Sequence, residues 1–278
     1  MNKRQTIYLS LIMVLLVIFG VSAYFVISYF TESQEQQAQF NELADLVANI
    51  QSQNPTTEAP TVSTEPAPTD PVTGETLETQ PTEPAELVML PEYAVLYERN
   101  QDIVGWMKID GTVINYPVMQ TPNDQNYYLK RNFNKEASSR GCLYVREQCD
   151  VFSPSDNLTI YGHNMRDGSM FNALNNFNSQ SYWQKNNLIT FDTLYEHHTY
   201  QIFAVFKTTA SVGKGFTYHL FVDAADEAEF DEFIATCKSL ALYDTGITPT
   251  YGDKLICLST CEYSQTNGRL VVVAVRIK

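Results

Sequence analysis

The sequence predicts a mainly β fold, a small barrel of short strands with helical additions. Two observations support this prediction. Segments with strand-like alternating or continuous apolar residues recur through residues 105–278, separated by short turns. One long amphipathic helix, at residues 223–242, interrupts them just before the last pair of strands. Many short strands with few helices are typical of a barrel.

The N-terminal segment predicts a membrane anchor. Residues Ile7 to Phe30 carry no charge, and as a helix they would extend about 36 Å, enough to cross a bilayer. A cleaved signal peptide is the alternative, because Val21-Ser22-Ala23 faintly resembles a cleavage site, but the apolar stretch is longer than a signal core. Lys3 and Arg4 precede the stretch, so the positive-inside rule places residues 1–6 in the cytoplasm. The expected localisation is the cell membrane, with a single pass and an extracellular domain.

Two segments are expected to connect this anchor to a folded domain. Residues 31–50 should form a juxtamembrane stalk helix, or a short coiled coil, because apolar residues recur there at helical spacing: Phe40, Leu43, Val47 and Ile50. Residues 51–86 hold seven of the twelve prolines, nine threonines and no aromatic residue, a composition that cannot bury enough apolar surface to fold. We therefore expect an acidic, disordered linker at 51–86 and a folded domain at 87–278.

The net charge of −14 belongs mainly to the connecting segments. Residues 31–98 hold thirteen Asp or Glu and no Lys or Arg, whereas residues 99–278 hold sixteen basic against nineteen acidic residues. A protein that binds nucleic acid would present a basic face. The composition therefore argues against nucleic acid as a partner.

Within residues 87–278, short strands alternate with helices. A helix is expected from Leu90 to Gln101, since Pro91 favours a first turn, and a hairpin from Gly105 to Gln120, since Asp110-Gly111 is a strong turn signal. The helix at 223–242 carries an apolar face: Phe230, Phe233, Ile234, Cys237 and Leu240. The remaining predicted segments are strands at 142–146, 158–161, 188–191 and 200–206, and helical turns at 169–185.

The last hairpin brings two reactive side chains together. Leu255 to Cys261 alternates as a strand, residues 262–268 have a turn composition, and Arg269 opens a β-branched apolar strand. If these strands pair, Cys261 and Arg269 lie on opposite sides of a short turn. A buried small cysteine and a surface arginine are the structural interpretation, and a thiol nucleophile beside a permanent positive charge is the functional one.

Among the four histidines, His163 is the candidate for acid–base chemistry. The strand Leu158 to Gly162 ends just before it and a polar loop follows, which is the geometry from which active-site side chains often project. A hydrogen-bonded structural histidine is the alternative. His197 and His198 lie in a turn, where solvated side chains are expected, and His219 lies among aromatic residues, where packing is expected.

Spacing argues against several other kinds of site. The five cysteines form no C-x-x-C pair and no metal-ligand spacing with the histidines, and no glycine-rich phosphate loop is present. A papain-like protease has its cysteine before its histidine, and a caspase has a Q-A-C-[RQG]-G signature, whereas residues 259–263 read Ser-Thr-Cys-Glu-Tyr. Cys257 and Cys261 would be about 13 Å apart in one strand and cannot form a disulfide. A Cys142–Cys149 disulfide stays open.

Taken in order, these motifs resemble the sortases. The residues that carry the resemblance are L-S-T-C at 258–261, Arg269 at the head of the last strand, and Tyr161-Gly162-His163 upstream. Further segments are similar to class B sortases: GWMKIDGT with YPV at 105–118, YLKRNF at 128–133 and FKTT at 206–209. The resemblance covers residues 90–278. It implies an eight-stranded sortase-type barrel with an N-terminal helix and an inserted helix before the last two strands.

The resemblance also implies a mechanism, that of a cysteine transpeptidase anchoring surface proteins to the Gram-positive cell wall. Cys261 would attack the Thr carbonyl of a C-terminal sorting motif, of the Asn-Pro-x-Thr type, and form a thioester. His163 would protonate the leaving amine and deprotonate the incoming one, while Arg269 and the Glu262 amide would bind the oxyanion. An amine of peptidoglycan or its lipid-linked precursor would resolve the thioester. No cofactor or metal is implied.

Similar class B enzymes place Tyr161, Ser259 and the residue matching Leu129 along the substrate groove, and Leu129 and Ser259 carry over by motif position. The full set of expected substrate contacts is Leu129, Tyr161, Ser259, Thr260 and Glu262. Glu262 lies in a loop that differs among relatives, and the expected groove wall at 211–220 matches poorly. Two other functions stay open: a pilin-polymerising sortase, which would use a lysine as acceptor, and a non-catalytic wall-binding ectodomain.

Overall fold

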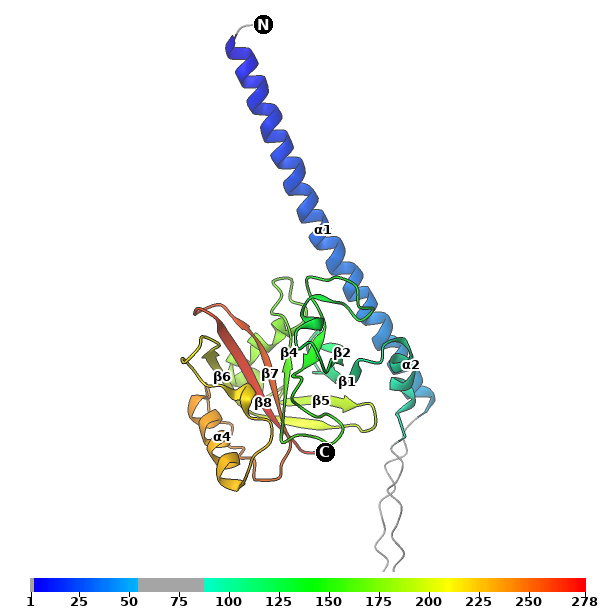
Figure 1. The fold of residues 1–278 in the computed structure, drawn as a ribbon, viewed down its shortest axis with the longest axis vertical. Helices are drawn as coiled ribbons and strands as arrows, with labels where there is room; N and C mark the ends of the chain where they lie inside the picture. Colours follow the sequence, from blue (N-terminus) through cyan, green and yellow to red (C-terminus); the bar gives the residue numbers. More distant parts are fainter. Residues whose placement is uncertain (1–2, 55–87) are drawn as a thin grey trace, which may run out of the picture.

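The computed structural model describes residues 3–54 and 88–278, in which eight strands form a closed barrel (Figure 1). The order around the barrel is β1-β2-β3-β4-β7-β8-β6-β5, and β1 pairs with β5 to close the ring. The strands are β1 (Ile103–Lys108), β2 (Asn115–Met119), β3 (Leu143–Val145), β4 (Asn157–Tyr161), β5 (Leu188–Thr193), β6 (Thr199–Thr209), β7 (Leu255–Glu262) and β8 (Gly268–Arg276). The predicted eight-stranded barrel with helical additions is confirmed.

Helices flank the barrel and fill its connections. They are α1 (Lys3–Gln53), α2 (Pro91–Arg99), α3 (Gln180–Trp183) and α4 (Glu227–Leu240), with 3₁₀ turns η1 (Tyr127–Lys130), η2 (Phe171–Asn178) and η3 (Tyr218–Leu220). The inserted helix before the last two strands is α4, and the Asp226 carboxylate caps it by accepting from the Glu229 amide.

The helical turns expected at 169–185 are 3₁₀ over most of their length, in η2, with one short α-helix after it. Asparagine side chains explain the difference. The Asn175 amide donates to the Asn172 carbonyl, and the Asn178 amide donates to the Asn175 carbonyl. Such local bonds compete with the α-helical pattern of backbone hydrogen bonds.

Strand β7 is buried on both faces, and its alternation separates two clusters of the core. Ile256 and Leu258 pack in the barrel interior, whereas Leu255 and Cys257 pack on the outer face beneath α4. Strand β8 alternates in the same way, which accounts for its continuous apolar run. The α4 insertion is therefore the cover that lets β6, β7 and β8 be apolar on both sides.

The helix α1 is continuous, and it changes character along its length (Figure 1). Its N-terminal part leaves the barrel as a long rod with exposed apolar side chains. Among the described residues it is the one helix long and apolar enough to cross a membrane, and its apolar window is unburied.

The C-terminal half of α1 packs on the barrel. Phe40, Leu43 and Val47 are at most 5% exposed and belong to the main core, and the Phe40 ring lies 4.9 Å from the Tyr116 ring. We expected residues 31–50 to form a stalk apart from a domain beginning at residue 87. The apolar face of this segment packs against the barrel instead, so residues 32–51 are part of the folded unit. The predicted linker at 51–86 lies, after residue 54, outside the described residues.

A polar cluster connects α2 to the turn between β5 and β6. The buried Asp192 carboxylate accepts from the Tyr93 hydroxyl at 2.6 Å and bonds His197 Nδ1 at 2.9 Å. His197 Nε2 lies 3.4 Å from the buried Glu92 carboxylate. The bond to Asp192 raises the pKa of His197, and burial opposes this only in part. His197 is exposed, as expected for a turn, and it also bridges two buried carboxylates. His198, which was expected to be solvated as well, is buried instead.

We predict that Phe40→Ala lowers the free energy of unfolding by about 3 kcal/mol, because it leaves a cavity between α1 and the barrel. Denaturant unfolding of the full chain in detergent, followed by tryptophan fluorescence, measures the change. Phe19→Ala is the matched control, since Phe19 is exposed on the same helix. Equal stability of the two variants would show that α1 is not part of the folded unit.

The His197 cluster predicts a pH dependence of stability. Because its pKa is raised in the folded state, protonated His197 contributes stability below its ordinary pKa of about 6.5. That contribution is lost as the pH rises through the higher folded pKa. His197→Gln should therefore destabilise the protein at about pH 6 and much less at about pH 9, in thermal unfolding at both values. A penalty independent of pH would mean that the imidazole acts by packing alone.

Candidate active site

Three neighbouring strands carry the predicted catalytic residues to one end of the barrel. Strands β4 and β7 run parallel, with Tyr161 paired to Ser259, and β7 and β8 run antiparallel, with Cys261 paired to Arg269. Cys261 is the second-last residue of β7 and Arg269 the second residue of β8. The predicted pairing of the two strands that carry Cys261 and Arg269, across the turn, is therefore present.

His163 follows β4 and continues its register toward Cys261. The Thr260 hydroxyl donates to the Gly162 carbonyl at 2.7 Å, and the Asn164 amide donates to the Cys261 carbonyl at 2.8 Å. The residues on both sides of His163 thus bond to Thr260 and Cys261. Almost a hundred residues of sequence separate the histidine from the cysteine, and the parallel pairing brings them to the same level.

The alternation of β7 determines which face of the sheet carries the chemistry. Side chains alternate along a strand, so Cys261 lies on the same face as Leu255 and Cys257, the outer face beneath α4. Ile256 and Leu258 lie on the opposite, interior face. Cys261 and Arg269 lie beyond the end of that covered region and are partly exposed. The thiol is therefore accessible from outside the barrel.

All five cysteines lie in the described residues and all are free thiols, Cys142 and Cys149 included. Cys261 differs from the other four, which are buried: Cys142, Cys149, Cys237 and Cys257. Burial raises the pKa of each of these four thiols. Because the thiolate is the reactive species, burial makes these four thiols poor nucleophiles.

His163 is held by a backbone carbonyl. Its Nε2 lies 2.8 Å from the Leu129 carbonyl oxygen. A carbonyl can only accept, so Nε2 must carry the hydrogen. In the neutral ring, Nδ1 is then the nitrogen that is free to exchange a proton. The tautomer is determined by the hydrogen bond that Nε2 makes to the Leu129 carbonyl.

Arg269 is anchored to its own turn. Its Nη1 donates to the Gly268 carbonyl at 2.9 Å and to the Asn267 carbonyl at 3.3 Å. These two bonds hold the guanidinium at the mouth of the β7–β8 turn. The pKa of His219 is lowered, mainly by burial and further by the positive charges of Arg146 and Arg269.

Three tyrosines lie beside these residues, of which Tyr144 and Tyr218 are buried and Tyr161 is partly exposed. The Tyr144 and Tyr161 rings lie 5.4 Å apart, and the Tyr218 hydroxyl is 2.6 Å from the Ser259 hydroxyl. Burial raises the pKa of Tyr144, and Tyr161, Cys261 and Arg269 act on it electrostatically. Tyr144 therefore lies among the candidate catalytic groups, although the sequence did not single it out.

The five predicted substrate residues differ in their exposure to solvent. Leu129 and Tyr161 are partly exposed, whereas Ser259 and Thr260 are at most 2% exposed. The hydroxyls of Ser259 and Thr260 bond within the protein, so a peptide would meet mainly their backbone. Glu262 pairs with Lys207 at 3.1 Å, and hydrogen bonds from Ser264 and Lys207 lower its pKa against the opposing effect of burial.

Asn164 is a residue of this site that sequence reasoning missed. It is 8% exposed, donates to the Cys261 carbonyl, and accepts through Oδ1 from Asn172 and Asn175. Its position directly after His163 in a polar loop was the available signal. Among the described residues, no group of three or more His, Cys, Asp or Glu could hold a metal ion.

The chain is similar to known proteins over most of its folded part. Residues 107–277 match the family described as Sortase domain. Sortase B of Staphylococcus aureus is 32% identical over 190 residues, which cover 68% of this chain and 75% of that protein. Sortase B of Listeria monocytogenes is 29% identical over 179 residues, covering 64% and 70%. A solved Staphylococcus aureus sortase B–substrate complex has a TM-score of 0.72 at 26% identity, covering 89% of this chain and 99% of that one.

The chain therefore belongs to the sortase family of cysteine transpeptidases, and within it to the class B sortases.

The difference in burial among the thiols predicts selective labelling. Iodoacetamide should modify one cysteine of the native full chain, Cys261, and all five after denaturation, as counted by intact mass. Cys261→Ala should take up no label in the native state, with Cys237→Ala as the matched control that keeps one. Rapid native labelling at any of the four other cysteines would contradict this description of the site.

Proposed function

We propose that this class B sortase anchors surface proteins to the cell wall, with Cys261 as nucleophile, His163 as acid–base and Arg269 as oxyanion partner. The substrate is a C-terminal sorting signal of the Asn-Pro-x-Thr type. One observation carries the proposal: β4, β7 and β8 bring these three residue types together at one end of the barrel, with the single accessible thiol of the five cysteines among them.

In the first half of the reaction, Cys261 Sγ attacks the carbonyl carbon of the threonine as the thiolate, with its proton held on His163. The carbonyl oxygen becomes an oxyanion, which the Arg269 guanidinium and the amide of Glu262 stabilise. His163 donates a proton to the departing amine as the C–N bond breaks. The surface protein is then held as a thioester on Cys261.

In the second half, an amine of peptidoglycan or of its lipid-linked precursor attacks the thioester. His163 removes a proton from the incoming amine, and the Cys261 thiolate leaves. The accessible outer face of the barrel at Cys261 supports this step, because a bulky acceptor needs an open approach. Leu129, Tyr161, Ser259, Thr260 and Glu262 are the proposed substrate contacts around the thiol.

The proposed location is the outer face of a cell membrane. Ile7 to Phe30 would span the bilayer as the N-terminal part of α1, with Lys3 and Arg4 on the cytoplasmic side. The exposure of the apolar side chains along this part of α1 supports the proposal, since these side chains need a nonpolar environment.

We predict that the full chain in detergent cleaves a fluorogenic Asn-Pro-x-Thr-x peptide and that Cys261→Ala abolishes cleavage. His163→Ala and Arg269→Ala should each lower kcat/KM by about 10²-fold or more, with the circular dichroism spectrum unchanged. Cys257→Ala, in the same strand but buried, is the control expected to keep activity. Full activity of Cys261→Ala would refute the assignment.

The same assay identifies the acceptor amine when candidate amines are added to the reaction. A peptidoglycan stem peptide or oligoglycine should appear in the product and raise turnover. A pilin-polymerising enzyme would instead couple the peptide to a lysine side chain. Mass spectrometry of the products distinguishes the two.

A further inference from the structure

The loop that follows His163, residues 163–170, is closed at its base and held at its tip. At the base, Asn164 pairs with Met170, and the Phe171 amide donates to the His163 carbonyl at 2.8 Å. The tip carries Asp167, followed by Gly168 in the left-handed region with φ +89°. Asp167 is therefore the tip of the loop whose base carries His163.

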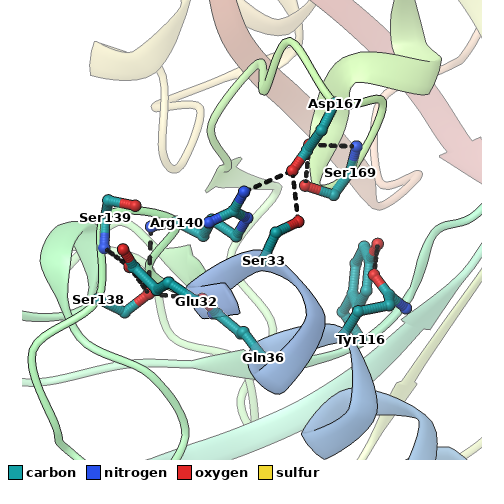
Figure 2. A network of polar contacts seen from close by, with 10 residues as sticks. Glu32, Ser33, Gln36, Tyr116, Ser138, Ser139, Arg140, Asp167 and Ser169 are labelled. Carbon is teal, nitrogen blue, oxygen red and sulfur yellow. Dashed lines mark hydrogen bonds and ion pairs between the residues drawn. The ribbon is translucent and has the colours of Figure 1, made fainter. Parts of the chain in front are cut away.

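Two residues from other parts of the chain hold Asp167 (Figure 2). Arg140 Nη2 donates to its Oδ2 at 2.5 Å, and the Ser33 hydroxyl of α1 donates to the same oxygen at 2.7 Å. The Ser169 amide and hydroxyl bond the other oxygen, Oδ1. Partial burial raises the pKa of Asp167, but the hydrogen bonds from Arg140, Ser169 and Ser33 outweigh it and hold the pKa well below its usual range.

Arg140 makes this contact a demanding one. Its side chain is 2% exposed, its guanidinium lies over the Tyr29 ring of α1 at 4.8 Å, and within the described residues its Nε and Nη1 have no hydrogen-bond partner. A buried charge that loses its counter-ion is costly. Asp167 is its salt-bridge partner, and the pair holds the loop tip against α1.

A second set of contacts connects α1 indirectly to His163, through Gly141 and the Leu129 carbonyl. Gln36, which is 5% exposed, donates to the Gly141 carbonyl at 2.6 Å. It also accepts from the Ser138 hydroxyl (Figure 2). Gly141 has φ +58°, and a Cβ there would lie 2.6 Å from the Leu129 carbonyl oxygen. That oxygen is the one that accepts from His163 Nε2. Gln36 therefore holds the Gly141 backbone, which packs against the Leu129 carbonyl.

We propose that Ser33 and Gln36 of α1, together with Arg140 and Asp167, are positioning residues that hold His163 in one tautomer and orientation. The inference rests on the proposed catalytic role of His163. One side of the arrangement holds the loop that carries the histidine, and the other holds the carbonyl that accepts from its Nε2. The segment directly after the apolar part of α1 thereby completes the active site.

The consequence is kinetic rather than architectural. If the loop tip is released, the imidazole can leave the Leu129 carbonyl, and either nitrogen can then carry the hydrogen. A displacement of about 1 Å in a catalytic group can lower the rate by as much as 10²-fold without unfolding the protein. Substrate contacts away from His163 should remain, so kcat should fall while KM stays nearly constant.

The test uses the full chain in detergent and four variants. Asp167→Asn should lower kcat about tenfold and Ser33→Ala about threefold, each with KM within about twofold of wild type. Ser33→Thr keeps the hydroxyl and should restore the wild-type kcat. Glu42→Gln is the matched control: it removes an exposed ion pair from α1 to Arg99, 3.3 Å long and separate from the His163 loop, and should change nothing.

A second measurement reads His163 directly and needs no turnover. Long-range ¹H–¹⁵N spectra of the histidine-labelled chain, with His163→Gln to assign the resonance, report which ring nitrogen carries the hydrogen. Wild type and Glu42→Gln should show the Nε2–H tautomer of neutral His163. Asp167→Asn and Ser33→Ala should shift it toward a mixture of tautomers.

The outcomes separate this inference from the proposed function. Unchanged tautomer and unchanged kcat in Asp167→Asn and Ser33→Ala would overturn the inference while leaving the enzyme assignment intact. A kcat that falls only in proportion to the folded fraction, measured by thermal unfolding, would also overturn it. An inactive wild type with the predicted tautomer shift would instead reject the proposed function and retain the positioning role.

Discussion

Strands β4 and β7 lie side by side and run parallel in the barrel. This pairing aligns Tyr161 with Ser259 and so brings the segment after β4 level with Cys261, while the antiparallel β8 places Arg269 on the other side. Parallel strands need a long crossover, and here that crossover contains β5, β6 and α4. The same elements close the barrel and cover its outer face. A residue pattern that is dispersed in the chain is thereby concentrated at one strand end.

The helix α1 joins two environments that the sequence presents as separate. Its apolar half is exposed and suited to a bilayer, whereas Phe40, Leu43 and Val47 complete the core of the barrel. Because Ser33 is bonded to Asp167, the loop carrying His163 lies next to the point where the apolar segment ends. With α1 in a membrane, the catalytic end of the barrel would lie close to the membrane surface.

Buried polar groups mark the places where elements distant in sequence are joined. Asp192 and Glu92 are joined by His197 where α2 meets the β5–β6 turn, and Arg140 is paired with Asp167 where α1 meets the His163 loop. Such groups are stable in the interior only while their partners stay in place. They make docking of the helices specific, whereas the apolar contacts alone would tolerate sliding. The two clusters differ in kind, since a histidine titrates near neutral pH and an arginine does not.

Sequence patterns predicted the class of fold, the apolar N-terminal segment and the pair Cys261 and Arg269. These follow from periodicity, composition and a single hairpin, which are local properties. His163 was singled out by its position after a strand, and its connection to Cys261 came from resemblance. The tertiary structure alone decided that residues 32–51 belong to the folded unit, that Asn164 bonds the Cys261 backbone, and that Ser33 and Asp167 meet. The physical reason is that each of these contacts joins residues that are far apart in the chain, and hydrogen bonds between distant residues leave no periodic trace in sequence.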